Sequence, residues 1–225
     1  EMSHLLDELP PDHGARESLE LGERVTVATL TPSMMTLLRP ENLPELRTVC
    51  SVGEPISGAL AARWAPGRLL INGYGLTETS IGASLAELTG PAARATIGRP
   101  LDNVQLYVLD ANLSPTPIGA VGEICIGGVQ VGRGYLNRPD LTDARFVPDP
   151  FCPRQDGRLY RTGDLGRLRA DGGIELLGRS DDQVKIRGYR VEPGEIAAAL
   201  EQHPEVAQAA VLVWNTPSSE PQLVA

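Results

Sequence analysis

The stretch ERVTVATLTPSMMTLL, residues 23–38, joins a run rich in β-branched residues to an apolar segment that begins with Thr31 and Pro32. A β-branched run favours a strand, and threonine followed by proline is a typical helix start, so the stretch predicts a strand and then a short helix. The alternation continues with strand-like, helix-like and strand-like runs at 46–52, 56–64 and 67–72. Strands that alternate with short helices predict a mostly parallel sheet.

After residue 100 the pattern changes to strand-like runs separated by glycine and proline. These runs lie at 104–110, 122–128, 158–164 and 173–178. Short strands with turn residues between them predict an antiparallel, barrel-like unit. A third pattern begins near Asp181, where a strand at 183–191, a helix at 195–202 and a strand at 206–213 predict a small α+β unit.

The composition is that of an ordinary globular protein. The chain has 225 residues, of which 41% are hydrophobic and 22% charged, and this excludes disordered and fibrous classes. The net charge is −9 and the pI is near 4.9, so nucleic acid and membrane, whose surfaces are themselves anionic, are poor partners. The sequence shows no apolar run of membrane-spanning length and no signal-like start, and we therefore expect a cytoplasmic protein.

The rare residue types exclude several kinds of site. Cys50, Cys125 and Cys152 are isolated and odd in number, which argues against a disulfide framework or a zinc site. With three histidines in the whole chain, a hydrolase triad or a histidine metal centre is a poor interpretation. Lys185 is the only lysine, which excludes a Gly-Lys-Ser/Thr phosphate loop within this chain.

The segment INGYGLTETS, residues 71–80, carries the side chains best suited to a nucleotide. Tyr74 offers a flat face for a purine, and Asn72 offers a paired donor and acceptor. Thr77 offers a hydroxyl for phosphate oxygen, and Glu78 offers a hard carboxylate ligand for Mg²⁺. Standing alone, such a glycine-rich turn is better explained as an ordinary loop.

Three more segments follow in a fixed order. They are GEICIGGVQVGRGYLNRPDLTDARF at 122–146, YRTGDL at 160–165 and GRSDDQVKIRGYRVEPGEI at 178–196. With INGYGLTETS they resemble the ordered core motifs of the amino-acid adenylation domains of nonribosomal peptide synthetases. These domains belong to the adenylate-forming, AMP-binding superfamily that includes acyl-CoA synthetases and luciferases. The resemblance covers residues from about 23 to 213.

The resemblance implies an α/β fold in three parts. Residues 1–100 would be the C-terminal part of the large α/β adenylation subdomain, and residues 101–180 a distorted, antiparallel β-barrel-like subdomain. Residues 181–225 would begin a small α+β C-terminal lid domain. In this family the lid takes two orientations, one for adenylation and one for thioester formation, and Asp181 would be the hinge.

The resemblance also assigns the site residues one by one. Thr77, Glu78 and Lys185 would be catalytic, with Glu78 attending Mg²⁺. Asp164 would accept both ribose hydroxyls, and Arg179 would approach the ribose or a phosphate. The remaining nucleotide contacts would come from Gly53, Glu54, Pro55, Asn72, Gly73 and Tyr74. The pocket for the substrate side chain would be lined by Thr29, Cys50, Val52, Gly73, Ile81 and Gly82.

These pocket residues are small or of medium size, so we expect an uncharged, moderately large substrate side chain, although each of them could equally be plain core. In the implied reaction a carboxylic acid, an amino acid or a related acid, attacks the α-phosphorus of MgATP to form an acyl-adenylate. The acyl group then passes to the phosphopantetheine thiol of a carrier-protein domain, typically in antibiotic biosynthesis. An MbtH-like helper protein is a further partner that the resemblance allows.

Two alternatives stay open. Leu76, in YGLTE, stands where peptide synthetases usually have proline, which leans toward an acyl-CoA or aryl-CoA ligase. A degenerate, non-catalytic AMP-binding module is the other alternative. The family's phosphate loop would precede residue 1 and its catalytic lysine would follow residue 225, so we expect this chain alone to be inactive, as a piece of a longer polypeptide or of an interrupted domain.

Overall fold

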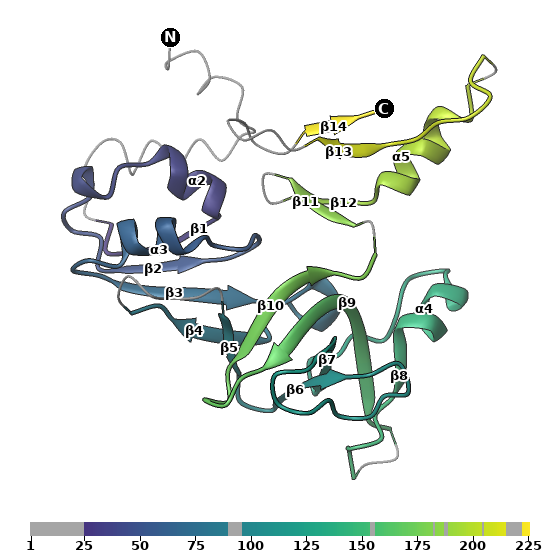
Figure 1. Cartoon of the computed structure of the whole chain (residues 1–225), viewed down its shortest axis with the longest axis horizontal. Helices are drawn as coiled ribbons and strands as arrows, with labels where there is room; N and C mark the ends of the chain where they lie inside the picture. Colours follow the sequence, from purple (N-terminus) through teal and green to yellow (C-terminus); the bar gives the residue numbers. More distant parts are fainter. Residues whose placement is uncertain are drawn as a thin grey trace.

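A computed structural model describes residues 25–89, 96–153, 156–181, 183–186, 189–203, 205–214 and 222–225. Within these ranges the fold is mixed α/β, as the sequence predicts, and it contains a ten-stranded sheet and few helices (Figure 1). The strand order along the sheet is β1-β2-β3-β4-β5-β10-β9-β7-β6, and β8 pairs with β9 to one side.

The first part of the sheet is parallel. Strands β1 (Val27–Leu30), β2 (Thr48–Ser51) and β3 (Leu69–Tyr74) run side by side in the same direction, which confirms the prediction for this region. Strand β4 (Ser84–Glu87) then pairs antiparallel with β3, and β5 (Thr96–Pro100) pairs with β4.

Two short helices cover one face of these strands (Figure 1). Helix α2 (Pro32–Leu37) begins after Thr31, whose side chain accepts a hydrogen bond from the Met34 amide. Helix α3 (Gly58–Trp64) begins in the same way at Ser57. Hydroxyl caps of this kind stabilise a helix start by satisfying a free amide. The buried side chains between helices and sheet include Met35 and Trp64, and the indole donates to the Met35 carbonyl.

The second part of the sheet is antiparallel. It contains β6 (Val104–Leu109), β7 (Val121–Gly128), β8 (Phe146–Pro148), β9 (Arg158–Leu168) and β10 (Ile174–Arg179). Helix α4 (Pro139–Arg145) precedes β8. The antiparallel prediction is confirmed, but in the described residues the sheet ends openly at β1 and β6, so it does not close into a barrel. Because β5 pairs with β4 and with β10, one sheet crosses residue 100, and the division at 100 and 180 stays a prediction.

The described residues of the last part, from 181 onward, form short strands and one helix. Strands β11 (Val184–Ile186) and β12 (Tyr189–Val191) form an antiparallel pair and lead into α5 (Pro193–Leu200). The prediction of a single strand over 183–191 is therefore wrong, because Val184 pairs with Val191. The strand predicted at 206–213 is shorter in the structure and begins later, as β13 (Leu212–Trp214). The residues of β13 are those that pair with β14 (Gln222–Val224).

Two single-turn 3₁₀ helices complete the description, η2 (Pro40–Asn42) and η3 (Thr77–Thr79). None of the helices in the described ranges has the length and apolar character that crossing a membrane requires.

Candidate functional site

Three side chains from three strands meet at one point. Asp164 on β9 is paired by register with Arg179 on β10, and the Arg179 guanidinium donates to its Oδ1 at 2.6 Å. The Tyr74 hydroxyl, 90 residues earlier in the chain, donates to Oδ2 at 2.6 Å. Tyr74 and Asp164 are 6% and 5% exposed. Burial and the neighbouring Asp164 charge raise the pKa of Tyr74 well above its usual range, so its hydroxyl keeps its proton and acts as donor.

The backbone at Gly163 makes room for this cluster. Its φ is +75°, in the left-handed region that favours glycine. A Cβ there would lie 2.7 Å from a carboxylate oxygen of Asp181 and 2.8 Å from a guanidinium nitrogen of Arg179. Gly163 lies within strand β9, where the pairing with β7 shifts register, and it allows both this irregular backbone and the close approach of two charged side chains.

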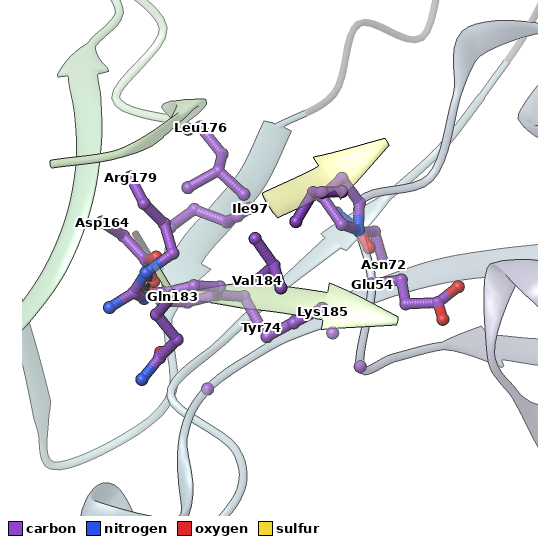
Figure 2. A pocket seen from close by; sticks show the side chains of 16 residues that line it. Glu54, Asn72, Tyr74, Ile97, Asp164, Leu176, Arg179, Gln183, Val184 and Lys185 are labelled. Atoms are coloured by element: carbon purple, nitrogen blue, oxygen red, sulfur yellow. Dashed lines mark hydrogen bonds and ion pairs between the residues drawn. The ribbon is translucent and has the colours of Figure 1, made fainter. Parts of the chain in front are cut away.

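These side chains form part of the wall of a cleft with a volume of about 350 Å³, within the range typical of small-molecule sites. Figure 2 shows Asp164 and Arg179 at one end of it, and Glu54 and Asn72 at the other. Lys185, Val184 and Gln183 come from the segment predicted as the lid, and Ile97 and Leu176 add apolar wall. Every residue predicted to contact the nucleotide lines this cleft: Gly53, Glu54, Pro55, Asn72, Gly73, Tyr74, Asp164 and Arg179.

Lys185 reaches the cleft from strand β11. Burial lowers the pKa of this ammonium group, and the negative charge of Asp164 opposes that effect only in part. Gln183, two residues earlier and also in the cleft wall, is 5% exposed and donates through Nε2 to Glu192.

Thr77 and Glu78 lie outside the cleft wall, on η3. Glu78 accepts hydrogen bonds from the Tyr135 hydroxyl at 2.8 Å and from Arg190 Nη1 at 2.9 and 2.8 Å. Burial alone would raise the pKa of Glu78, but the Tyr135 hydrogen bond and the Arg190 charge prevail and lower it. The carboxylate is therefore charged at neutral pH, and both of its oxygens are engaged.

Four of the predicted substrate-pocket residues lie on one face of the parallel strands. Thr29 pairs with Cys50 across β1 and β2. A Cβ built on Gly73 would lie 3.0 Å from Val52 Cγ1 and 3.5 Å from Cys50 Sγ. The other two, Ile81 and Gly82, follow η3, and the Ile81 side chain is 82% exposed at a φ of +74°.

Asp181, predicted as the hinge, lies between β10 and β11. Its carboxylate accepts from Arg179 at 2.6 and 2.9 Å and from Arg145 on α4 at 3.0 Å. Burial would raise the pKa of this carboxyl, but the two guanidinium groups lower it. The junction between the sheet and the segment that follows is thus fastened by ion pairs.

Comparison with known proteins identifies the family. The AMP-binding enzyme family matches residues 10–136, which is more than half of the chain. The chain belongs to the AMP-binding enzyme family. It is 48% identical over 202 residues to novobiocin biosynthesis protein H of Streptomyces niveus, covering 89% of this chain and 33% of that protein. It is 47% identical over 188 residues to bacitracin synthase 3 of Bacillus licheniformis, covering 84% of this chain and 3% of that protein.

Solved structures agree with this assignment. NpsA-ThdA of Klebsiella oxytoca, an artificially fused adenylation and PCP di-domain of a nonribosomal peptide synthetase, matches with a TM-score of 0.82 and 30% identity. The match covers 96% of this chain and 41% of that one. This AMP-binding chain thus spans about a third of novobiocin biosynthesis protein H and less than half of the solved di-domain.

The cleft has unmet hydrogen-bonding capacity of the kind a nucleotide would use. Glu54 Oε1 and Gln183 Oε1 are buried and have no hydrogen-bond partner in the described part of the chain. Glu54 Oε2 is taken by the Ser33 amide and hydroxyl. Buried polar atoms without partners are costly, so acceptors at a cleft wall fit a ligand that carries N–H or O–H donors. Adenine and ribose both carry such donors.

A metal ion would find few protein ligands here. In the ranges that the structure describes, no three His, Cys, Asp or Glu side chains come together. Mg²⁺ in nucleotide sites is usually held by one or two carboxylates together with phosphates and water. In an AMP-binding enzyme Glu78 fits that single-carboxylate role by its chemistry, once its present partners release it.

Sequence reasoning assigned no role at the site to three residues of interest, Gln183, Tyr135 and Arg190. Strand periodicity could have identified Gln183, because residues two apart on a strand face the same side and Lys185 was already a candidate. Tyr135 has no such local signal, since it reaches Glu78 across 57 residues of sequence.

Proposed function

We propose that this chain is the nucleotide-binding part of an enzyme that activates a carboxylic acid, an amino acid or a related acid, as an acyl-adenylate. The observation that carries the proposal is the contact between Tyr74 and Asp164, which come from distant motifs and share one cleft with Arg179 and Lys185. A purine-sized face, a buried carboxylate and two cations at one cleft are what an adenosine phosphate requires.

Each carboxylate oxygen of Asp164 accepts one hydrogen bond from the protein, which leaves each with a further lone pair. Asp164 can therefore accept one ribose hydroxyl on each oxygen while Tyr74 and Arg179 hold it in place. Glu54 and Asn72, at the other end of the cleft, would border the adenine.

In the proposed reaction an oxygen of the substrate carboxylate bonds to the α-phosphorus of ATP, and the bond from that phosphorus to the pyrophosphate oxygen breaks. The chain need supply no nucleophile, so its part is to position two anions and to balance their charge. Arg179 and Lys185 supply positive charge at the cleft. Mg²⁺, when bound, would neutralise charge on the phosphates, and Thr77 and Glu78 are the residues that would attend it.

The acyl group would then pass to the phosphopantetheine thiol of a carrier-protein domain. The similarity to bacitracin synthase 3 and to an adenylation and PCP di-domain supports such a partner. A cytoplasmic location and dependence on an MbtH-like helper are parts of the proposal that rest on the family resemblance. So does a side-chain pocket formed by Thr29, Cys50, Val52, Gly73, Ile81 and Gly82, which would admit an uncharged side chain.

A CoA ligase is the second candidate, favoured by Leu76, which is buried in the sheet core where peptide synthetases usually have proline. ATP–pyrophosphate exchange by the full-length protein, with a panel of amino, hydroxy, keto and aryl acids, tests the first half-reaction. Acid-dependent exchange is expected. Its absence with every acid, together with no ATP binding, would indicate a non-catalytic module. Adding CoA or a carrier protein to the preformed adenylate then separates the two candidates by which thiol consumes it.

A further inference from the structure

The carboxylate of Glu78 is held by a network that joins the body of the protein to the segment predicted as the lid. Arg190, on strand β12, contacts both carboxylate oxygens through Nη1. Its Nη2 also reaches the Tyr160 hydroxyl at 3.4 Å. The two side chains of the ion pair are 10% and 32% exposed for Glu78 and Arg190, so water screens the pair only in part. This contact spans 112 residues of sequence and crosses the proposed hinge at Asp181.

Two tyrosines complete the network. The Tyr135 hydroxyl uses its proton on Glu78, and it lies 3.1 Å from the Tyr160 hydroxyl. Because Tyr135 has only one proton to donate, Tyr160 must donate to Tyr135 and accept from Arg190. Burial and the neighbouring hydroxyl and carboxylate raise the pKa of Tyr135, so it remains a donor. The rings are held by Phe146, whose centroid lies 5.3 Å from that of Tyr135 and 5.0 Å from that of Tyr160.

A divalent cation at Glu78 would have to displace part of this network. Mg²⁺ binds carboxylate oxygen at about 2.1 Å and in strict octahedral geometry. Both oxygens of Glu78 already lie within 2.9 Å of one guanidinium nitrogen. A metal ion at that distance would stand beside the guanidinium, and two cations so close repel strongly in a partly buried site.

We propose that Arg190 and a divalent cation are alternative partners of the Glu78 carboxylate, so that metal binding releases the lid from its present position. The inference rests on the proposed function, since it takes MgATP as the ligand that brings the metal. In the arrangement seen here, Arg190 holds Glu78 and Lys185 lines the nucleotide cleft. When the metal takes Glu78, the β11–β12 pair loses its ion pair with the body, while Asp181 keeps its ion pairs with Arg145 and Arg179 and stays the point about which the lid turns.

The test uses the full-length protein with Arg190→Gln, and Mn²⁺ in the presence of ATP as the spectroscopic probe. Removing the competing guanidinium is expected to tighten Mn²⁺ binding, measured by electron paramagnetic resonance, by about fivefold or more. Arg190→Lys keeps the charge but not the two-oxygen contact, and it should fall between the two. Arg167→Gln is the matched control, because Arg167 pairs with Glu175 within the sheet body, away from Glu78.

A second readout follows the lid itself, through spin labels on Ile118 in the body and Leu200 on α5, both of which are exposed. In the wild type the label distance should change as Mn²⁺ and ATP are added, and in Arg190→Gln it should change at a lower Mn²⁺ concentration. Suppose that the wild type binds ATP and exchanges pyrophosphate, while Arg190→Gln leaves both the Mn²⁺ affinity and the distance titration unchanged. That result would overturn this inference but not the proposed function. A wild type that binds neither ATP nor Mn²⁺ would overturn the proposed function as well.

Discussion

Replacing Asp164 by alanine removes the buried carboxylate that is proposed to accept hydrogen bonds from the ribose. A hydrogen bond to a charged group contributes about 1.5 to 3 kcal/mol, and each 1.4 kcal/mol is a factor of ten in affinity. Tyr74 and Arg179 each use one lone pair of the carboxylate, which leaves one free lone pair on each oxygen, so the substitution removes the acceptors of two ribose hydroxyls. Loss of one of these bonds corresponds to about tenfold and loss of both to about a hundredfold or more, so we expect Asp164→Ala in the full-length protein to weaken ATP binding, measured by calorimetry, by at least about tenfold.

The cost to stability should be moderate, and this separates binding from folding. Arg179 keeps Asp181 and the Thr162 carbonyl, but the buried Tyr74 hydroxyl loses its acceptor, so the free energy of unfolding should fall by about 1 to 3 kcal/mol. Asp149→Ala is the matched control, because Asp149 is also buried, accepts from the Phe151 amide and lies outside the cleft. An ATP affinity of Asp164→Ala within about twofold of that of wild type and control would refute the ribose assignment.

Three other predictions follow from single contacts. Lys185, the only lysine, should show a reactivity midpoint below the ordinary lysine pKa of about 10.4 in competitive acetylation of the full-length protein, read by mass spectrometry. At pH values between that lowered pKa and the ordinary value, the unfolded state binds more protons than the folded state, so the free energy of unfolding should rise with pH. Lys185→Met should remove this rise. A reactivity midpoint at or above the ordinary lysine pKa would contradict the prediction. Gly73→Ala brings a methyl group to 3.0 Å from Val52, so kcat/KM for acids with large side chains should fall relative to small ones, and an unchanged ratio would count against the pocket. Gly163→Ala should lower the melting temperature more than Gly119→Ala, because both have a left-handed φ but only Gly163 is crowded by Asp181 and Arg179; equal losses would show that crowding is unimportant.

Local sequence patterns were sufficient for most of the fold. The β-branched and apolar runs of β1, β2 and β3, and the Thr31-Pro32 start of α2, predicted the parallel part, because the side-chain periods of strands and helices differ within a few residues. They failed at 183–191, where a continuous apolar and basic pattern conceals a pair of strands. Gly188, a residue type common in turns, is the one local sign in the sequence that this run could be two paired strands.

The candidate site divides in the same way. Motif resemblance was able to bring Tyr74, Asp164 and Arg179 to one site, although they lie far apart in the sequence. Motif resemblance could not predict the partners of Glu78, because the Tyr135 hydroxyl and the Arg190 guanidinium meet that carboxylate only after distant elements have folded against each other. Contacts of this kind depend on side-chain placement across elements and leave no spacing signal in the chain.

The proposed function requires a nucleotide to bind with its purine near Tyr74 and near residues 53–55. Photolabelling of the full-length protein with 8-azido-ATP, followed by peptide mapping, tests it most directly. Label is expected on peptides that contain residues 53–55 or 72–75, and an excess of ATP should suppress it. Label confined to other peptides, such as those around the separate cavity beside Cys152 and Arg158, would contradict it.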